Sequence, residues 1–329
     1  MHYNIVIVAD ERYIQHSAVM LTSLFCTNRE KQFVIYLLTD GISVATEAKL
    51  RMVCNNYHAQ LNVINCSIEN LGDFPIGQWQ PIMYFKLLIP QLLPSSEDRC
   101  LFLDGDMIVH DDIKPLYSWN LEDKVIAAAE DIPDCLSFKS RLGLEPSVVC
   151  INSGVMVCNL IKWRKMEHAL PIMEYASKII GKIVNEQDVL ACYFQNKIAL
   201  LPIRWNMTTF YFFRSPKIFD KYLPELNVSK RNPGIIHFAA PIKPWFKDCQ
   251  HPYRKLYRKF LKLTPFGLAN ALGAKRANSI TADESTLAQV GSAYGNDIQN
   301  ALKYSGKKYG LFSRSKRRKA NALIAEANR

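Results

Sequence analysis

Two aspartates separated by a single glycine interrupt an apolar run in this chain. Residues 100–111 read CLFLDGDMIVHD, a pattern typical of a buried strand except for Asp104 and Asp106. Carboxylates buried without a partner or a cation are costly. The aspartates therefore lie at the exposed end of a strand that stops at Leu103, or they bind a cation. The two interpretations are compatible.

Paired carboxylates are hard oxygen ligands that suit Mg²⁺ or Mn²⁺, and one added imidazole would favour Mn²⁺. The D-x-D pattern alone is weak evidence, because a chain of this length contains roughly one by chance. His237 could supply the imidazole, although a single histidine in a strand is more often a core residue. It precedes FAAPIKPW, whose prolines and tryptophan indicate a loop that presents Lys243.

Continuous apolar runs alternate with helical patterns along the chain. We expect strands at 4–8, 33–38, 61–66, 100–103, 124–131, 150–160 and 234–239. We expect helices at 18–24, 46–57 (capped by Ser43), 82–93, 163–178 and 186–194. This alternation predicts an α/β fold with a mostly parallel central sheet flanked by helices. In such sheets ligands bind at the carboxyl ends of the strands, where Ala9-Asp10 and the aspartate pair fall.

The character of the sequence changes after about residue 265, where small and polar residues replace the apolar periodicity. We therefore expect a single catalytic domain over residues 1–268 and a basic C-terminal extension over 269–329. Residues 270–329 contain 11 Lys and Arg against 4 Asp and Glu, which accounts for most of the net charge of +11. A basic extension favours an anionic partner, either nucleic acid or acidic lipid.

The sequence contains no apolar run of about 18 residues, the length needed for a transmembrane helix. The start, MHYNIVIVADER, lacks the basic beginning and the apolar length of a signal peptide, and resembles a first core strand. Nine cysteines are scattered without a CxxC pair, a pattern that favours reduced thiols. We expect a cytoplasmic protein.

Nine segments, in order, make the chain resemble glycosyltransferase family 8. They are VADERY (8–13), LTDGIS (38–43), YFKLLIPQLLP (84–94), LFLDGDMIV (101–109), AAAED (127–131), INSGVMVCNLIKWR (151–164), NEQDVL (185–190), LPIRWN (201–206) and HFAAPIKPW (237–245). The resemblance implies a GT-A (Rossmann-like) fold and a retaining hexosyltransferase. It is greatest to the bacterial lipopolysaccharide galactosyl- and glucosyltransferases.

The resemblance also implies a set of ligands and site residues. Asp104, Asp106 and His237 would ligate Mn²⁺, with Mg²⁺ as the alternative, and the metal would act as a Lewis acid on the diphosphate of UDP-galactose or UDP-glucose. The residues implied to bind this UDP-sugar are Ala9, Asp10, Tyr13, Lys86, Asp104, Gly105, Asp106, Asn152, Ser153, Gln187, His237, Ala240 and Lys243. Those implied at the reacting centre are Gln187, Asp188, Asn152 and Asp131.

Within this implied site, Ala9, Asp10 and Tyr13 would hold the uridine, and Lys243 would lie at the phosphates. Gln187 would lie on the face of the anomeric carbon opposite UDP. Because an amide is a poor nucleophile, we expect a front-face reaction in which the departing phosphate deprotonates the acceptor hydroxyl.

Three positions depart from the family pattern. Lys86 stands where arginine is common, Ala240 where glycine is usual, and Arg12 where an uncharged polar residue is frequent. Lysine keeps the charge but loses the two-pronged guanidinium. These departures bear on the choice of donor sugar, and none is a proposed metal ligand.

The implied partner is a saccharide or lipooligosaccharide acceptor in lipopolysaccharide or cell-surface glycan synthesis. The basic extension would then contact the anionic inner face of the cytoplasmic membrane, and no nucleic acid is expected.

Two other functions remain as alternatives. A metal-dependent nucleotidyltransferase would also use an aspartate pair, but usually has a glycine-rich phosphate loop that VADERY lacks. A non-catalytic nucleotide-sugar or nucleic-acid binding module would not need Asp104, Asp106 and His237 together.

Overall fold

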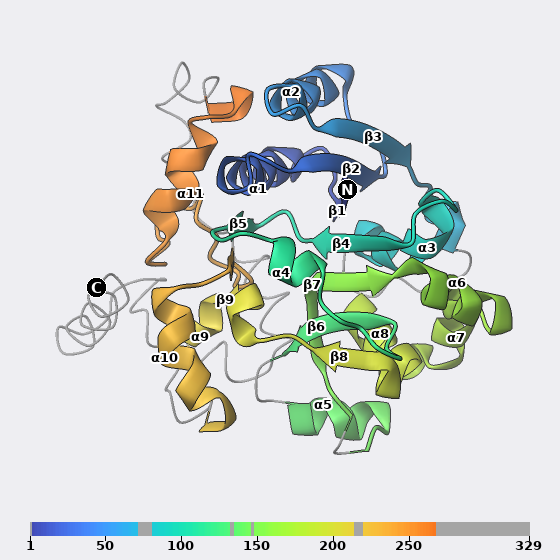
Figure 1. The fold of residues 1–329 in the computed structure, drawn as a ribbon. Helices are drawn as coiled ribbons and strands as arrows, with labels where there is room; N and C mark the ends of the chain where they lie inside the picture. The colour runs from blue at the N-terminus through green and yellow to red at the C-terminus, as the bar shows by residue number, and fades with distance from the viewer. Residues whose placement is uncertain (1, 72–80, 132–134, 146–147, 214–219, 268–329) are drawn as a thin grey trace.

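The computed structural model of the chain describes residues 2–71, 81–131, 135–145, 148–213 and 220–267 (Figure 1). The predicted extension, 269–329, lies outside these ranges. The proposed boundary at residue 268 therefore stays a prediction.

A seven-stranded sheet forms the centre of the fold, in the order β3-β2-β1-β4-β7-β6-β8. Its strands are β1 (His2–Val8), β2 (Gln32–Thr39), β3 (Gln60–Asn65), β4 (Arg99–Leu103), β6 (Ile126–Glu130), β7 (Ile151–Asn159) and β8 (Ile198–Leu200). β3, β2, β1 and β4 pair in parallel, and so do β6 and β8. β7 runs antiparallel to both of its neighbours, β4 and β6. The predicted mostly parallel α/β sheet is confirmed.

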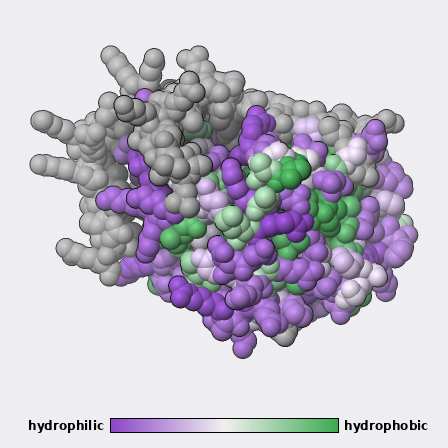
Figure 2. All heavy atoms as spheres, turned by 90° about the horizontal axis from the view of Figure 1, so that it is seen from above, coloured by the Kyte–Doolittle hydropathy of each residue, from purple (hydrophilic) through white to green (hydrophobic). Residues whose placement is uncertain are grey.

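Helices cover both faces of this sheet (Figure 1). Ile5 and Ile7 of β1 pack into the core beneath α1 and α2, while Val6 faces the core formed with α6, α7 and α8. Because both faces are buried, the strands read as continuous apolar runs and not as alternating ones. On the side viewed in Figure 2, polar side chains cover most of the described surface and apolar ones form scattered patches.

The α-helices have the following bounds: α1 (Ile14–Thr27), α2 (Val44–Asn55), α3 (Ile89–Leu92), α4 (Lys114–Tyr117), α5 (Cys135–Leu142), α6 (Leu160–Ala169), α7 (Ile172–Lys178), α8 (Glu186–Phe194), α9 (Thr209–Phe213), α10 (Leu223–Arg231) and α11 (Arg254–Leu261). The 3₁₀ turns are η1 (Ile68–Leu71), η2 (Pro81–Leu88), η3 (Ile180–Lys182), η4 (Gln195–Lys197) and η5 (Ile203–Asn206). As predicted, Ser43 caps α2, because its hydroxyl oxygen accepts a hydrogen bond from the Thr46 amide at 3.2 Å.

Two helix predictions are wrong, and a proline explains each. The segment expected as one helix over 82–93 is the 3₁₀ turn η2 followed by the short α3, which contains Pro90. The helix expected over 163–178 is divided into α6 and α7, with Pro171 between them. Proline has no amide proton for the bond to the preceding turn and its ring crowds that turn, so it disfavours the interior of an α-helix, and Pro90 is tolerated in the first turn of α3.

A second, three-stranded sheet has the order β5-β10-β9 and joins distant parts of the chain. Its strands are β5 (Met107–Val109), β9 (Met207–Thr208) and β10 (Ile235–His237). β5 and β10 pair antiparallel, with His237 opposite Met107. This register places the histidine next to Asp106, so the small sheet assembles the candidate metal ligands.

Candidate active site

The aspartate pair occupies the turn between β4 and β5. The Asp104 amide donates to the carbonyl oxygen of Gly154 at 2.9 Å, and the Phe238 amide donates to the carbonyl oxygen of Asp106 at 3.0 Å. Gly105 is required by packing, since a Cβ there would lie 2.4 Å from the hydroxyl oxygen of Ser17 on α1. The turn is therefore anchored on three sides. The predicted contact of Gly105 with substrate stays a prediction.

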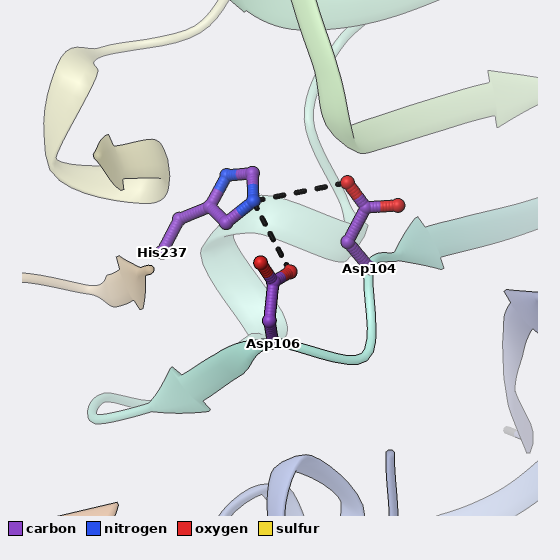
Figure 3. Close-up of side chains that lie close together, drawn as sticks. All are labelled: Asp104, Asp106 and His237. Carbon is purple, nitrogen blue, oxygen red and sulfur yellow. Dashed lines mark ion pairs between the residues drawn. The ribbon is translucent and has the colours of Figure 1, made fainter. Parts of the chain in front are cut away.

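Asp104, Asp106 and His237 converge on one point (Figure 3). One ligand atom from each residue lies within 4.8 Å of the other two. Nε2 of His237 is 3.3 Å from Oδ1 of Asp106 and 3.8 Å from Oδ2 of Asp104. The Asp104 side chain is 31% exposed, so the cluster opens to solvent on that side.

The orientation of His237 is fixed by a neighbouring amide. Nδ1 of His237 lies 2.8 Å from Oδ1 of Asn206, an amide oxygen that can only accept a hydrogen bond. Nδ1 therefore carries the proton in the neutral ring, and the Nε2 lone pair points at the two carboxylates. Three acceptors that face one another repel unless nearby positive charge compensates them, and they offer a cation three ligand atoms at once. The donor set fits a divalent metal ion.

Gly154 on β7 leaves the space that such an ion requires. A Cβ at this position would lie 2.5 Å from Cε1 of His237 and 2.8 Å from Oδ2 of Asp104. The sequence analysis did not single out this residue. The sequence did contain an indication of its role, because a glycine in the interior of an apolar strand indicates a close approach of another group.

Two lysines flank the acidic cluster; Lys86 is buried, and the Lys243 side chain is 17% exposed. Nζ of Lys243 donates to Oδ2 of Asp106 at 2.5 Å and to the carbonyl oxygen of Phe238 at 2.7 Å. Burial alone would raise the pKa of Asp106, but attraction by Lys243, joined by His237 when its ring is protonated, outweighs burial and lowers that pKa below its usual range. Asp106 is therefore ionised at neutral pH, as a metal ligand must be.

Lys86 joins the cluster to α8. Its Nζ is 2.8 Å from Oε1 of Glu186 and 3.4 Å from Oδ1 of Asp104, and it donates to the Ser153 hydroxyl oxygen at 3.3 Å. Burial would lower the pKa of Lys86, but the two carboxylates raise it above its ordinary value. The residue that replaces the family's arginine is thus a buried, protonated cation.

Glu186 is a site residue that the sequence analysis missed. It is 3% exposed, and its Oε1 accepts from Lys86 and from the Ser153 hydroxyl. Its Oε2 is buried and has no hydrogen-bond partner among the described residues. A buried acceptor without a partner is costly, and a ligand hydroxyl that reached this oxygen would relieve that cost. In the sequence, only its place beside Gln187 in the segment NEQDVL pointed to it, and its burial appears only in the structure.

The structure brings Gln187, Ser153 and Asp131 together, and their predicted roles stay predictions. Oε1 of Gln187 accepts from the Ser153 amide at 3.0 Å, and its Nε2 donates to Oδ2 of Asp131 at 2.7 Å. Asn152 lies alongside, where its Oδ1 accepts from Nδ2 of Asn206 at 2.8 Å. The glutamine side chain is therefore held at both ends.

Asp188 has different surroundings from its neighbours on α8. Its Oδ2 accepts from Nη2 of Arg141 at 3.0 Å and from the Val184 amide at 2.7 Å. These contacts tie it to α5 and to the start of α8, and none of them involves the metal cluster. Its predicted role at the reacting centre stays a prediction.

The residues expected to hold uridine follow β1. Ala9 is buried, and Oδ1 of Asp10 accepts from the Tyr13 amide at 2.8 Å, which forms the turn into α1. Arg12 pairs with the same carboxylate at 3.2 Å. Ala240 is partly exposed between β10 and Lys243. Contacts of these residues with a nucleotide stay predictions.

Comparison with known proteins decides the family. The model of "Glycosyl transferase family 8" matches residues 4–249, which is more than half of the chain. The chain belongs to glycosyltransferase family 8. This family-8 enzyme thus carries the DxD-type candidate metal site described above, and the fold and family predicted from the sequence are confirmed.

Relatives of this family-8 enzyme cover most of its length. General stress protein A of Bacillus subtilis is 24% identical over 284 residues, covering 84% of this chain and 97% of its own. The lipopolysaccharide 1,2-glucosyltransferase of Escherichia coli K12 is 26% identical over 270 residues, covering 80% of this chain and 78% of its own. The crystal structure of galactosyltransferase LgtC with donor and acceptor sugar analogues has a TM-score of 0.71 at 21% identity. The match covers 87% of this chain and 99% of the LgtC chain. This structural likeness shows the shared fold.

The space at Gly154 gives a test of the metal site in which no proposed ligand is itself replaced. In Gly154→Ala the added methyl group must displace His237 or Asp104, so we expect Mn²⁺ to bind the ligand-free protein about tenfold or more weakly, as measured by calorimetry. Gly181→Ala is the matched control, because a Cβ there meets no atom within 4 Å. Equal Mn²⁺ affinity in Gly154→Ala and the wild type would contradict the proposed site.

Proposed function

We propose that this glycosyltransferase transfers a hexose, galactose or glucose, from a UDP-sugar to a saccharide acceptor with retention at the anomeric carbon. The observation that carries the proposal is the convergence of Asp104, Asp106 and His237 within 4.8 Å beside the ammonium group of Lys243. A diphosphate that leaves as an anion needs cationic groups where its charge develops. This cluster can hold a metal and already holds a lysine.

Donor binding follows from the positions of these groups. Asp104, Asp106 and His237 would hold Mn²⁺, or Mg²⁺ as the alternative, which supplies a Lewis acid for the charge of the diphosphate. Lys243 would contact a phosphate oxygen from the Asp106 side. Ala9, Asp10 and Tyr13 lie after β1 and would hold the uridine, with Ala240 in the phosphate loop. Gly105 would allow close approach of the ligand to the turn.

The hexose would lie over Lys86 and Glu186. The free Oε2 of Glu186 is an acceptor for a sugar hydroxyl, and Lys86 and Ser153 orient that carboxylate. A site that hydrogen-bonds a hydroxyl discriminates strongly against a sugar that lacks it at that place. We therefore propose that Glu186 takes part in the choice between galactose and glucose.

The contacts of Gln187 favour a positioning role in the reaction. Its carbonyl oxygen already accepts from the Ser153 amide, and its nitrogen already donates to Asp131. In the front-face route the acceptor oxygen bonds to the anomeric carbon as the bond from that carbon to the phosphate oxygen breaks. The bonding electrons leave with UDP, and the acceptor proton moves to the departing phosphate. Asn152, Asp131 and Asp188 would position the acceptor side.

Release of UDP from UDP-galactose and UDP-glucose, with Mn²⁺ and with a chelator, tests this function. We expect release only with metal, and Asp106→Ala to lower kcat/KM about a thousandfold, because it removes a ligand and the partner of Lys243. Product analysis separates the alternatives, since a nucleotidyltransferase would transfer the uridylyl group and release the hexose 1-phosphate in place of UDP, and a binding module would form no product. Metal-independent release of UDP, or full activity of Asp106→Ala, would contradict the proposal.

Replacement of Gln187 separates the two routes to retention. Gln187→Ala removes the amide but no group that forms a bond in the front-face route, so we expect turnover to fall about a hundredfold and to stay measurable. Retention would be checked by the anomeric configuration of the product. Complete loss of turnover with unchanged UDP-sugar binding would contradict the front-face route.

The acceptor and the location of the enzyme are proposed together. One relative is named a lipopolysaccharide glucosyltransferase, which favours a lipooligosaccharide acceptor at the inner face of the cytoplasmic membrane. No helix in the described part of the chain is long and apolar enough to span a bilayer. α11 reads RKLYRKFL, and its Lys255, Arg258 and Lys259 are exposed just before the basic residues 269–329. We propose that this extension contacts anionic lipid.

Sedimentation with vesicles tests the membrane contact. We expect the full chain to bind anionic vesicles at low salt, to dissociate as salt rises, and to lose about tenfold or more of its affinity on truncation after Leu268. Neutral vesicles are the control, and UDP release confirms that the truncated protein is folded. Equal binding by the full and truncated chains would contradict this part of the proposal.

A further inference from the structure

His16 is a buried imidazole next to the candidate site that none of the roles above includes. It lies in the first turn of α1 and is 6% exposed. Its ring stacks on the indole of Trp245, with 3.5 Å between ring centroids and 10° between ring planes. On the other side, a hydrogen bond of 2.6 Å joins its Nδ1 to the hydroxyl of Tyr257 on α11.

These two contacts join three separate segments. α1 packs on the central sheet, Trp245 belongs to the loop after β10, and α11 packs against α1. The Phe246 amide donates to the carbonyl oxygen of Lys243 at 3.0 Å, which closes a turn containing Trp245. Pro244 restricts this turn further, so the backbone of Trp245 and that of Lys243 are held as one unit.

The imidazole acts here as a neutral ring. Burial lowers the pKa of His16 to about 3, so the ring is uncharged at neutral pH although Asp106 is near enough to raise that pKa slightly. A protonated ring would place a second positive charge beside Lys243. A neutral ring adds stacking and one hydrogen bond to the loop without this repulsion.

We propose that His16 is a positioning residue, which holds Trp245 and thereby fixes the turn that presents Lys243. The inference rests on the proposed function, in which Lys243 contacts the diphosphate of the donor. A lysine held in place before binding loses less conformational freedom when it contacts a phosphate. His16 would therefore act on nucleotide affinity through Lys243, without touching the nucleotide.

Four variants separate the two contacts of His16. His16→Ala loses both, and we expect the Kd for UDP with Mn²⁺ to rise about tenfold, with KM rising similarly and kcat little changed. His16→Phe keeps a stacked ring and Tyr257→Phe removes only the hydroxyl, so each should raise Kd about threefold. Because both delete the same hydrogen bond, the double variant should be no weaker than either single one.

Tyr117→Phe on α4 is the matched control. It also deletes a buried tyrosine hydroxyl, which is 3.3 Å from both the Asn4 amide and the carbonyl oxygen of Arg99. We expect it to lower stability as Tyr257→Phe does and to leave UDP affinity unchanged. Equal loss of UDP affinity in both variants would contradict the proposal, because a general loss of stability would then explain the effect.

Hydrogen exchange of the Phe246 amide in the ligand-free protein gives a readout that does not depend on UDP. We expect faster exchange in His16→Ala and Tyr257→Phe, and wild-type exchange in Tyr117→Phe. If the wild type does not bind UDP, the proposed function is wrong, and exchange still tests the positioning role. Unchanged exchange in Tyr257→Phe and His16→Phe would overturn the inference, even if His16→Ala fails to fold and even if UDP affinity falls.

Discussion

The candidate site depends on the electrostatics of three acceptors that face one another. Asp104, Asp106 and the Nε2 lone pair of His237 meet at the junction of the two sheets. Without a cation this arrangement is repulsive, and burial strengthens the repulsion because water no longer screens it. The backbone nonetheless holds it in place through Gly154, Phe238 and the pairing of β5 with β10.

The two lysines explain how this cluster is stable in the protein alone. Lys243 pairs with Asp106, and Lys86 lies between Asp104 and Glu186. Lys86 is buried and Lys243 is mostly so, and for each the nearby carboxylates raise the pKa above its ordinary value. A bound metal would take over part of the role of Lys243 at Asp106, which would free that ammonium group for a phosphate.

The sequence predicted the parts of the fold that depend on local pattern. Buried parallel strands read as apolar runs, and the carboxylates fall at the end of one of them, so β1, β2 and β4 and the aspartate turn could be expected. The breaks at Pro90 and Pro171 were missed because apolar periodicity continues across them. The missing amide proton of each proline would have indicated an interruption of the helix near it.

Long-range features could not be read from the sequence by pattern alone. The proximity of His237 to Asp106 depends on the register of β5 with β10, across more than a hundred residues of chain. The resemblance to the family supplied it, whereas spacing did not. Glu186 and His16 were missed because their roles arise from burial, an orphaned oxygen and a stacked ring, which appear only after packing.

The most direct test of the central claim is a pulsed electron paramagnetic resonance measurement of Mn²⁺ bound to the purified enzyme. We expect one ion per chain whose spectrum shows coupling to an imidazole nitrogen. The nitrogen coupling should vanish in His237→Ala, and affinity should fall sharply in Asp104→Asn and Asp106→Asn. Nitrogen coupling that persists in His237→Ala, or Mn²⁺ affinity that is unchanged by both aspartate replacements, would contradict the account.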